Sequence, residues 1–395
     1  MRVERLWTKP FIQMTVGMLF LFTGFYLLLP TMPLYIKHLG GTESQVGLAA
    51  GLFTLSAVVF RPFVGALVDR HGRRPFYVWG LLLFVISMVL YDWVGGILLL
   101  LLLRMVHGVS WAFATTSVGT AITDLIPASR RGEGMGWYGM AMTVAMAIGP
   151  MLGTALASGD SFRTLFLVAA GLSLAAWVLA FMTKVPFQPK PSAGRIRLIE
   201  PSVLPVTVAI FFLAVAYGGI TTFLPLFAAS ISVNPGTFFL VYAIALTLIR
   251  PFAGKLSDRF GEAAVIMPSL VITALSLLLL SLSDGLVGLI AAAILYGIGF
   301  GSAQPALQAA TLRIAPEDRR GAANASFMTA FDLGIGLGAI ILGWVSEQTG
   351  YPLLFAIASV SVVVSLVIFA LFVKRLLRTD AVLISSAGTP AKHGE

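Results

Sequence analysis

The chain alternates between long apolar runs and short polar segments along almost its whole length. The runs have about 18 to 25 residues, which is the length that an α-helix needs to cross the hydrocarbon core of a bilayer. This pattern predicts an all-α membrane protein with twelve transmembrane helices. The expected helices lie near residues 11–33, 46–68, 75–94, 96–122, 133–157, 163–183, 204–230, 237–256, 263–283, 286–312, 321–345 and 351–373.

The second six of these helices repeat the first six at a constant spacing. The segment 61–72 reads RPFVGALVDRHG, and the segment 250–261, which begins 189 positions later, reads RPFAGKLSDRFG. The same spacing relates Gly108 to Gly297, Pro127 to Pro316 and Gly149 to Gly338. A register kept over this distance indicates two halves of like topology.

The repeat and the polar segments divide the chain into four parts. Residues 1–183 are expected to form an N-terminal six-helix bundle, and residues 204–378 a pseudo-symmetric C-terminal six-helix bundle. Residues 184–203 are rich in proline and basic side chains, which favours a cytoplasmic linker between the bundles. Residues 379–395 are expected to form a disordered cytoplasmic tail.

The distribution of charge predicts the orientation in the membrane. The chain is 58% hydrophobic and 11% charged, and it has 26 basic residues and a net charge of +9. If both termini lie on one side, most of the basic residues lie there too, whereas only Lys37 and Arg163 lie on the other. Excess Lys and Arg mark the cytoplasmic face, so we expect a multi-pass protein of the cell membrane with both termini cytoplasmic. The positive charge then indicates contact with anionic membrane lipid and not with nucleic acid.

Several classes of function find no support in the sequence. The chain has no cysteine, which excludes disulfides and thiolate metal sites. It contains no G-x-x-x-x-G-K-[ST] phosphate loop, no H-E-x-x-H metal motif and no Rossmann glycine pattern. We therefore expect neither an enzyme nor an ATP-driven pump, and no metal or cofactor. Transport would draw its energy from an ion gradient or from the gradient of the substrate.

The loop after the second expected helix carries the most specific motif. It runs from Gly65 to Arg74 as GALVDRHGRR, and it resembles the signature loop between helices 2 and 3 of the major facilitator superfamily. Its second copy, at 254–261, resembles the second-half version of that loop. The resemblance implies the major facilitator fold, in which two six-helix halves rock about a central site, and it implies a transporter without naming the substrate.

Two further segments are similar to the drug:proton antiporter branch of this superfamily. The segment 100–108, with Arg104 and Gly108, is similar to its helix 4 signature. Gly149, Pro150 and Gly153 are similar to its helix 5 antiporter signature. The resemblance implies that Arg104 takes part in proton coupling or organises the cavity, and that the helix 5 motif bears on the direction of transport.

The signature loop suggests a gate on the cytoplasmic side. Gly65 would let a helix approach closely, Asp69 could accept hydrogen bonds from the N-terminus of a helix in the other half, and Gly72 would make a tight turn. The gate would also include a charge cluster and the second copy of the motif: Arg70, Arg73, Arg74, Asp124, Asp258 and Arg259. Alternatively, the arginines only fix the topology and bind lipid headgroups.

Ionisable residues within the helices are the best candidates for proton coupling, because each is costly unless it is paired or faces a cavity. Asp332 lies eleven residues after Gly321, or about 16 Å along a helix, and it is the one carboxylate placed near the bilayer centre. Desolvation there suits reversible protonation. His107 shares a helix face with Arg104 and could titrate near neutral pH. The alternatives are a structural aspartate and a histidine that only bonds a neighbouring helix.

The expected cavity would be mostly apolar and adaptable. Its candidate lining residues are aromatic, thioether and amide side chains: Phe25, Tyr26, Trp111, Met142, Met146, Tyr217, Gln304 and Gln308. Such residues are also common in packing and lipid-facing positions. Arg61 and Arg250 occupy equivalent repeat positions before prolines, which favours a structural role such as bonding freed carbonyls.

These features predict a proton-coupled antiporter that exports small amphipathic or cationic organic molecules by alternating access. Protonation of Asp332 would compete with the substrate, and the protein is expected to act as a monomer. The alternative is a transporter of a hydrophilic metabolite, such as a sugar or a metal-chelating small molecule, that binds substrate charge through Arg104 and Asp332. A scaffold or receptor without transport is a third class.

Overall fold

The computed structural model describes residues 5–127, 130–157, 162–185, 200–316 and 319–377, and within these it has twelve helices long and apolar enough to cross a membrane. This confirms the predicted fold class. The helices are α1 (Lys9–His38), α2 (Glu43–His71), α3 (Arg73–Tyr91), α4 (Ile97–Leu125), α5 (Arg131–Leu156), α6 (Arg163–Met182), α7 (Leu204–Ser230), α8 (Pro235–Phe260), α9 (Glu262–Ser281), α10 (Leu286–Ile314), α11 (Arg320–Thr349) and α12 (Tyr351–Ile368). Most of the expected linker and the expected tail lie outside the described residues.

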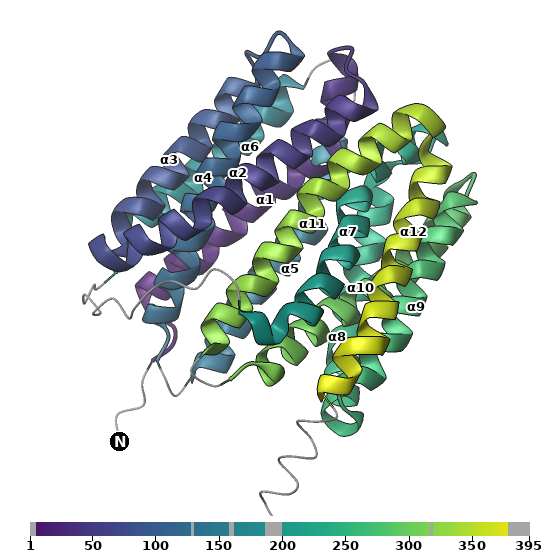
Figure 1. Cartoon of the computed structure of the whole chain (residues 1–395). Helices are drawn as coiled ribbons and strands as arrows, with labels where there is room; N and C mark the ends of the chain where they lie inside the picture. Colours follow the sequence, from purple (N-terminus) through teal and green to yellow (C-terminus); the bar gives the residue numbers. More distant parts are fainter. Residues whose placement is uncertain (1–4, 128–129, 158–161, 186–199, 317–318, 378–395) are drawn as a thin grey trace, which may run out of the picture.

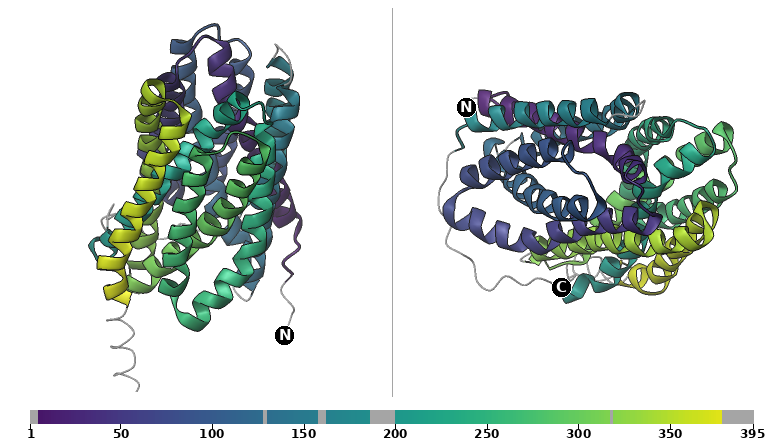
Figure 2. Two further views of the ribbon diagram at one scale, coloured as in Figure 1. Left: turned by 90° about the vertical axis from the view of Figure 1, so that its right-hand side faces the viewer. Right: turned by 90° about the horizontal axis from the view of Figure 1, so that it is seen from above.

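The helices pack into two groups that follow the chain order. In the first group α1 packs on α5 and α6, and α4 packs on α2 and α3. In the second group α7 packs on α11 and α12, and α10 packs on α8 and α9. The two groups meet where α2 contacts α11, α5 contacts α8 and α1 contacts α7. Figures 1 and 2 show the helices of both groups running roughly alongside one another.

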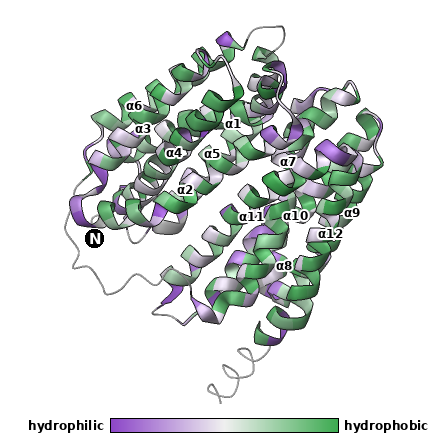
Figure 3. Cartoon of the chain, turned by 45° about the horizontal axis from the view of Figure 1, so that its top comes forward, coloured by the Kyte–Doolittle hydropathy of each residue, from purple (hydrophilic) through white to green (hydrophobic). Residues whose placement is uncertain are grey.

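The two ends of the molecule differ in what they carry. The described chain begins before α1 and leaves α12 at the same end, which we call the terminal end, and the opposite end is the distal end. Figure 3 shows hydrophobic residues along most of the helices and hydrophilic residues gathered mainly near their ends, as expected for membrane-spanning segments.

The sequence repeat is also a repeat of contacts. A Cβ added to Gly108 on α4 would lie 2.1 Å from the carbonyl oxygen of Phe53 on α2. A Cβ added to Gly297 on α10 would lie 2.8 Å from the carbonyl oxygen of Tyr242 on α8, at the equivalent position. In both halves a glycine lets two helices cross with their backbones nearly touching.

The turns after α2 and α8 are equivalent as well. Gly72 has φ of 90° and Gly261 has φ of 82°. These values lie in the left-handed region, where an L-residue with a Cβ is strained. Glycine at both positions therefore allows each helix to reverse at once into the next.

One ion pair is present in both halves with its charges exchanged. In the first half Nε of Arg73, at the start of α3, lies 2.6 Å from Oδ2 of Asp124, near the end of α4. In the second half Arg313, near the end of α10, lies 2.7 Å from Glu262, at the start of α9. Glu262 occupies the repeat position of Arg73, and Arg313 that of Asp124. The contact between the two helices is thus the same and only its polarity differs.

This exchange predicts that the first-half pair tolerates reversal. Arg73→Glu and Asp124→Arg alone are each expected to destabilise the protein by about 0.2–1 kcal/mol, because each leaves a like-charge contact. The double exchange should restore most of the loss. Thermal unfolding of the purified protein measures this, and a double variant no more stable than the single variants would contradict it.

Candidate substrate cavity

A cavity of about 330 Å³ lies between the two groups of helices. Its wall is built by α1, α2, α4, α5, α7 and α11, so both halves contribute. Most of the lining side chains are apolar or aromatic, and three of them are charged: Arg61, Arg104 and Asp332. This size and composition are typical of a site for a small organic molecule.

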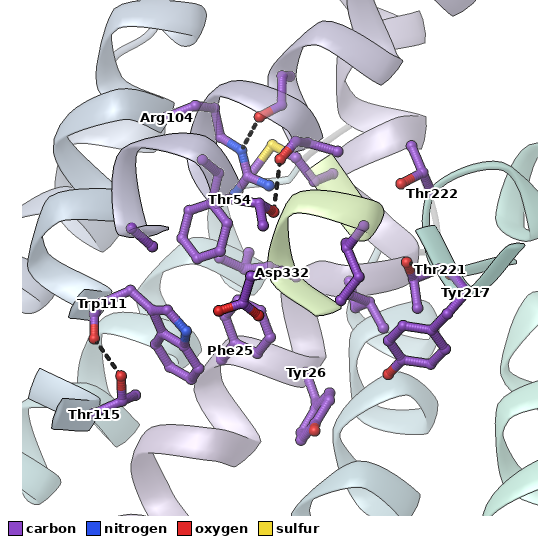
Figure 4. A pocket seen from close by; sticks show the side chains of 18 of the residues that line it. Phe25, Tyr26, Thr54, Arg104, Trp111, Thr115, Tyr217, Thr221, Thr222 and Asp332 are labelled. Carbon is purple, nitrogen blue, oxygen red and sulfur yellow. Dashed lines mark hydrogen bonds between the residues drawn. The ribbon is translucent and has the colours of Figure 1, made fainter. Parts of the chain in front are cut away.

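Aromatic rings form much of the wall. The Phe25 ring stacks on the Trp111 ring at a centroid distance of 4.2 Å. It also stacks on the Phe53 ring, at a centroid distance of 5.6 Å. From the opposite half Tyr217 stacks on Phe331 at 5.8 Å. Figure 4 shows Asp332 between these groups, near Phe25 and Trp111. A flat apolar ligand could therefore be held on two sides by ring faces.

Asp332 pairs with an arginine from the other half. Nη1 of Arg61 on α2 donates a hydrogen bond to Oδ2 of Asp332 on α11, and both side chains line the cavity. The pair therefore joins α2 to α11 at the cavity wall. The structure gives Arg61 this carboxylate as its partner, and not the backbone carbonyls that the sequence suggested.

Arg104 also lies in the cavity wall, but unlike Arg61 it contacts a carbonyl oxygen and an aromatic ring. Its Nε donates to the carbonyl oxygen of Ala49 at 3.3 Å, and its Cζ lies 4.7 Å from the centroid of the Phe53 ring. Among the described residues no carboxylate lies within ion-pair distance of this guanidinium group. The cavity thus holds one neutralised pair and one further positive charge.

His107 lies one turn after Arg104, but it does not line this cavity. The side chain is fully buried and its Nδ1 is 3.0 Å from the hydroxyl of Tyr91 on α3. Its ring also packs edge-on against Phe84, with centroids 4.6 Å apart. These contacts place His107 within the first half, between α3 and α4.

The other predicted lining residues divide into two groups. Phe25, Tyr26, Trp111, Met142 and Tyr217 line the cavity. Three others lie outside its lining: Met146, Gln304 and Gln308. Nε2 of Gln308 donates to Oδ1 of Asn324 on α11 at 2.9 Å, so this amide joins two helices of the same half.

Polar residues that the sequence did not single out also reach the cavity. They are Thr54, Thr115, Thr221 and Thr222. The hydroxyls of Thr54, Thr115 and Thr221 donate to carbonyls of their own helices. Isolated threonines are common in apolar helices, so no sequence signal marks these four.

At the distal end α2 and α11 are in close contact. A Cβ added to Gly47 would lie 2.2 Å from the carbonyl oxygen of Ala339. The backbone N–H of Ser44 donates to Oε2 of Glu347 at 3.2 Å, and the hydroxyl of Tyr351 donates to Oε1 of Glu43 at 3.1 Å. The two halves are therefore closed against each other at this end.

At the terminal end three glycines have no close neighbour on another helix. A Cβ added to Gly65 on α2, Gly254 on α8 or Gly321 on α11 would meet none of the described atoms within 4 Å. The close contacts between α2 and α11 described above thus lie toward the distal end.

The residues of the predicted gate lie at the terminal end. Arg73 pairs with Asp124, Nη2 of Arg74 donates to the carbonyl oxygen of Phe181 at 2.9 Å, and Arg70 is exposed. The side chains of Asp69 and Asp258 lie outside the part of the chain that the structure describes. The latch assigned to Asp69 stays a prediction.

The helix 5 motif packs α5 closely on α1. A Cβ added to Gly149 would lie 2.6 Å from Cβ of Tyr26, and one added to Gly153 would lie 2.2 Å from the carbonyl oxygen of Leu27. Since Tyr26 lines the cavity, this contact also positions part of its wall. Pro150 lies within the helix, between the two glycines.

The architecture and the cavity agree with a comparison against known protein families. The model described as Major Facilitator Superfamily matches residues 14–238 and again residues 206–392, and so covers nearly the whole chain. The chain belongs to the major facilitator superfamily. This superfamily consists of membrane transporters, so the chain is a multi-pass secondary transporter of small molecules.

Similar members of the superfamily include export proteins. The quinolone resistance protein NorA of Staphylococcus aureus is 28% identical over 339 residues, which are 82% of this chain and 86% of that protein. The staphylopine export protein of the same species is 24% identical over 383 residues, which are 91% of this chain and 94% of that protein. These relatives support the drug:proton antiporter type within the superfamily.

Solved structures of the superfamily share the fold. A bacterial homologue of the human lysosomal transporter Spinster, solved in an inward-facing and occupied conformation, has a TM-score of 0.80 and 17% sequence identity. The match covers 94% of this chain and 97% of that one. At this identity the likeness extends to the fold alone.

Proposed function

We propose that this chain is a proton-coupled antiporter that exports small amphipathic organic molecules across the cell membrane. The observation that carries the proposal is the ion pair between Arg61 and Asp332, which joins the two halves at the wall of an aromatic cavity. A carboxylate so placed can change its charge and the contact between the halves in a single step.

The geometry suggests how proton and substrate would exclude each other. A proton on Asp332 removes the negative charge that holds Arg61, and a cationic group of a substrate could displace Arg61 from the same carboxylate. Because both compete for one carboxylate, the transporter would carry either one in a given half-cycle. The six-helix halves, taken as the two domains, would rock about this contact.

The orientation follows from the charge pattern. With both termini cytoplasmic, the terminal end would face the cytoplasm, and the close contacts between α2 and α11 at the distal end support an inward-facing state. Substrate would enter the cavity from the cytoplasm, and protons would reach Asp332 after the halves reverse. We propose that a monomer carries out this cycle, since one chain supplies the whole cavity wall.

A hydrophilic substrate is the second candidate, and Arg104 is the observation that favours it. With Asp332 neutralised by Arg61, Arg104 gives the cavity an excess positive charge that could bind an anionic group. The aromatic lining favours the amphipathic class, because ring faces contribute most to the binding of apolar groups.

Transport by purified protein in liposomes tests the proposal. An imposed pH gradient should drive lipophilic aromatic compounds across the membrane in the direction opposite to the flow of protons. Accumulation of only hydrophilic metabolites would favour the second candidate. Transport that is indifferent to the pH gradient would contradict proton coupling.

Arg61→Gln is expected to reduce proton-driven transport by about tenfold, because Asp332 then has no cation to release when it is protonated. Arg250→Gln is the matched control. Arg250 holds the repeat position of Arg61, and the described residues offer it no ion-pair partner, so the control should lose less than about twofold. Equal losses in both variants would contradict a special role for Arg61.

A further inference from the structure

A second concave site lies outside the central cavity, on the second half of the molecule. It is a groove of about 500 Å³ between α8 and α9, with α10 as its floor, and we call it the α8–α9 groove. Its walls are mostly apolar, and they include Phe252, Leu256 and Phe260 of α8, all of which are exposed. Such a groove in the membrane-spanning part of a protein faces acyl chains.

Two basic residues lie in the half of the groove that is nearer the end of α8. Lys255 and Arg259 line it and are one helical turn apart on α8. Both are exposed, and the described residues place no carboxylate within ion-pair distance of either. The Arg259 guanidinium lies 5.1 Å from the centroid of the Phe260 ring. The groove therefore combines apolar walls with two positive charges that are available to an anion.

The length of the groove matches one leaflet of a bilayer. It extends along α8 from Arg259, in the last turn, to Ile249. Ten residues at 1.5 Å each span about 15 Å, which is half of the roughly 30 Å hydrocarbon core. A lipid with its headgroup at Arg259 would thus extend its acyl chain to the bilayer centre beside Ile249.

In the first half, aromatic residues fill the position that is equivalent to this groove. Val265, Pro268 and Ser302 line the groove, and their repeat positions hold aromatic residues: Phe76, Trp79 and Phe113. The rings of Phe76 and Phe113 stack on each other with centroids 6.2 Å apart, so they occupy the equivalent space between the helices. The residue of the first half at the repeat position of Lys255 is Ala66, which has no charge. At these three positions the second half therefore has the smaller side chains, and it also has the additional charge at Lys255.

We propose that the α8–α9 groove binds an anionic phospholipid, with the phosphate at Lys255 and Arg259 and one acyl chain along the apolar wall. Basic pockets between transmembrane helices are known to suit acidic headgroups. This binding site is separate from the transport cavity and does not depend on the proposed substrate or on proton coupling.

A photoreactive lipid would locate the site. The full-length protein is placed in phosphatidylcholine nanodiscs with a trace of phosphatidylglycerol that carries a photoreactive group on its acyl chain, and labelled peptides are mapped. Labelling is expected within residues 249–272 and 298–302. Unlabelled phosphatidylglycerol should displace the label at concentrations about tenfold lower than added phosphatidylcholine.

Matched variants test the contribution of the two cations separately from that of the apolar groove. Lys255→Gln with Arg259→Gln should reduce labelling of these peptides by about tenfold. Arg70→Gln, at the repeat position of Arg259, should change it by less than about twofold. Ser302→Phe introduces the first-half residue, and it should remove acyl-chain labelling although both cations are retained. Because Ser302 is buried, the two exposed glutamine substitutions provide the test if the phenylalanine variant does not fold.

Three results would overturn the proposal. They are equal labelling by a photoreactive phosphatidylcholine, unchanged labelling in the double glutamine variant, and displacement of the lipid by inorganic phosphate alone at the same concentration as by phosphatidylglycerol. The last result would mean that the cations bind a free anion and that the apolar groove contributes nothing.

Discussion

Asp332→Asn is expected to abolish proton-driven transport, with a loss of at least about a hundredfold in the initial rate. Asparagine has nearly the shape of aspartate, but it cannot take up and release a proton. It also leaves Arg61 without the charge that it pairs with in the cavity wall. Uptake of a transported aromatic compound into inverted vesicles, measured with and without a pH gradient, gives the effect directly.

Two controls separate coupling from stability. The variant must insert and purify as a single species, because an unpaired arginine can also destabilise the protein. The double variant Arg61→Gln with Asp332→Asn removes both charges, so it should recover stability while proton-driven transport stays lost. If either variant kept transport that depends on the pH gradient, the proton-coupling role of Asp332 would be disproved.

Gly47→Ala is expected to lower the population of the conformation in which the halves are closed at the distal end. The added Cβ would lie 2.2 Å from the carbonyl oxygen of Ala339 in the other half. The backbones of α2 and α11 must then separate where the halves now touch. The transport rate should fall by about tenfold or more, since a transport cycle requires the halves to close at the distal end and at the terminal end in turn. The fold of each half should be unaffected.

Gly108→Ala is the matched control, because it creates an equally close contact at 2.1 Å, but with Phe53 in the same half. It should destabilise the protein by about 1–3 kcal/mol without moving the halves. The chain has no cysteine, so spin labels at Gly95→Cys and Val287→Cys would report one distance across the distal end. An unchanged distance in the Gly47 variant would contradict the expectation.

The architecture could be predicted from sequence because its signals are local. The length of an apolar run determines whether a helix can span the bilayer, and the recurrence of 61–72 at 250–261 determines that there are two equivalent sets. The depth of Asp332 could also be found, because residues can be counted along a helix. The exact helix ends could not, since α1 continues to His38, beyond the apolar run expected to end near residue 33.

The partner of Asp332 was not predicted, and the repeat itself obscured it. Arg61 and Arg250 occupy equivalent positions, which suggested a shared structural role. The repeat position of Asp332, however, is Thr143, whose hydroxyl donates to the carbonyl oxygen of Gly139. The pair of Arg61 with Asp332 therefore has no equivalent at the repeat positions, Arg250 and Thr143. It depends on how α2 of one half lies against α11 of the other, which no local pattern encodes.

The cavity lining shows the same limit. Phe25 and Trp111 could be proposed from their helices, but sequence could not distinguish them from Gln308, which points to another helix. Rotation of a helix about its axis decides which of its faces meets the cavity. In a helix that is apolar on all sides, the hydrophobic pattern does not determine that rotation.

The exchanged ion pairs have a consequence for how a duplicated chain folds in the membrane. Two similar halves offer each helix a wrong partner, since α3 could pack on α10 and α9 on α4. In the first mistake Arg73 would meet Arg313, and in the second Glu262 would meet Asp124. Both mispairings bring like charges together, whereas the native pairings do not. The opposite polarity of the two pairs thus helps each half to recognise its own helices during assembly.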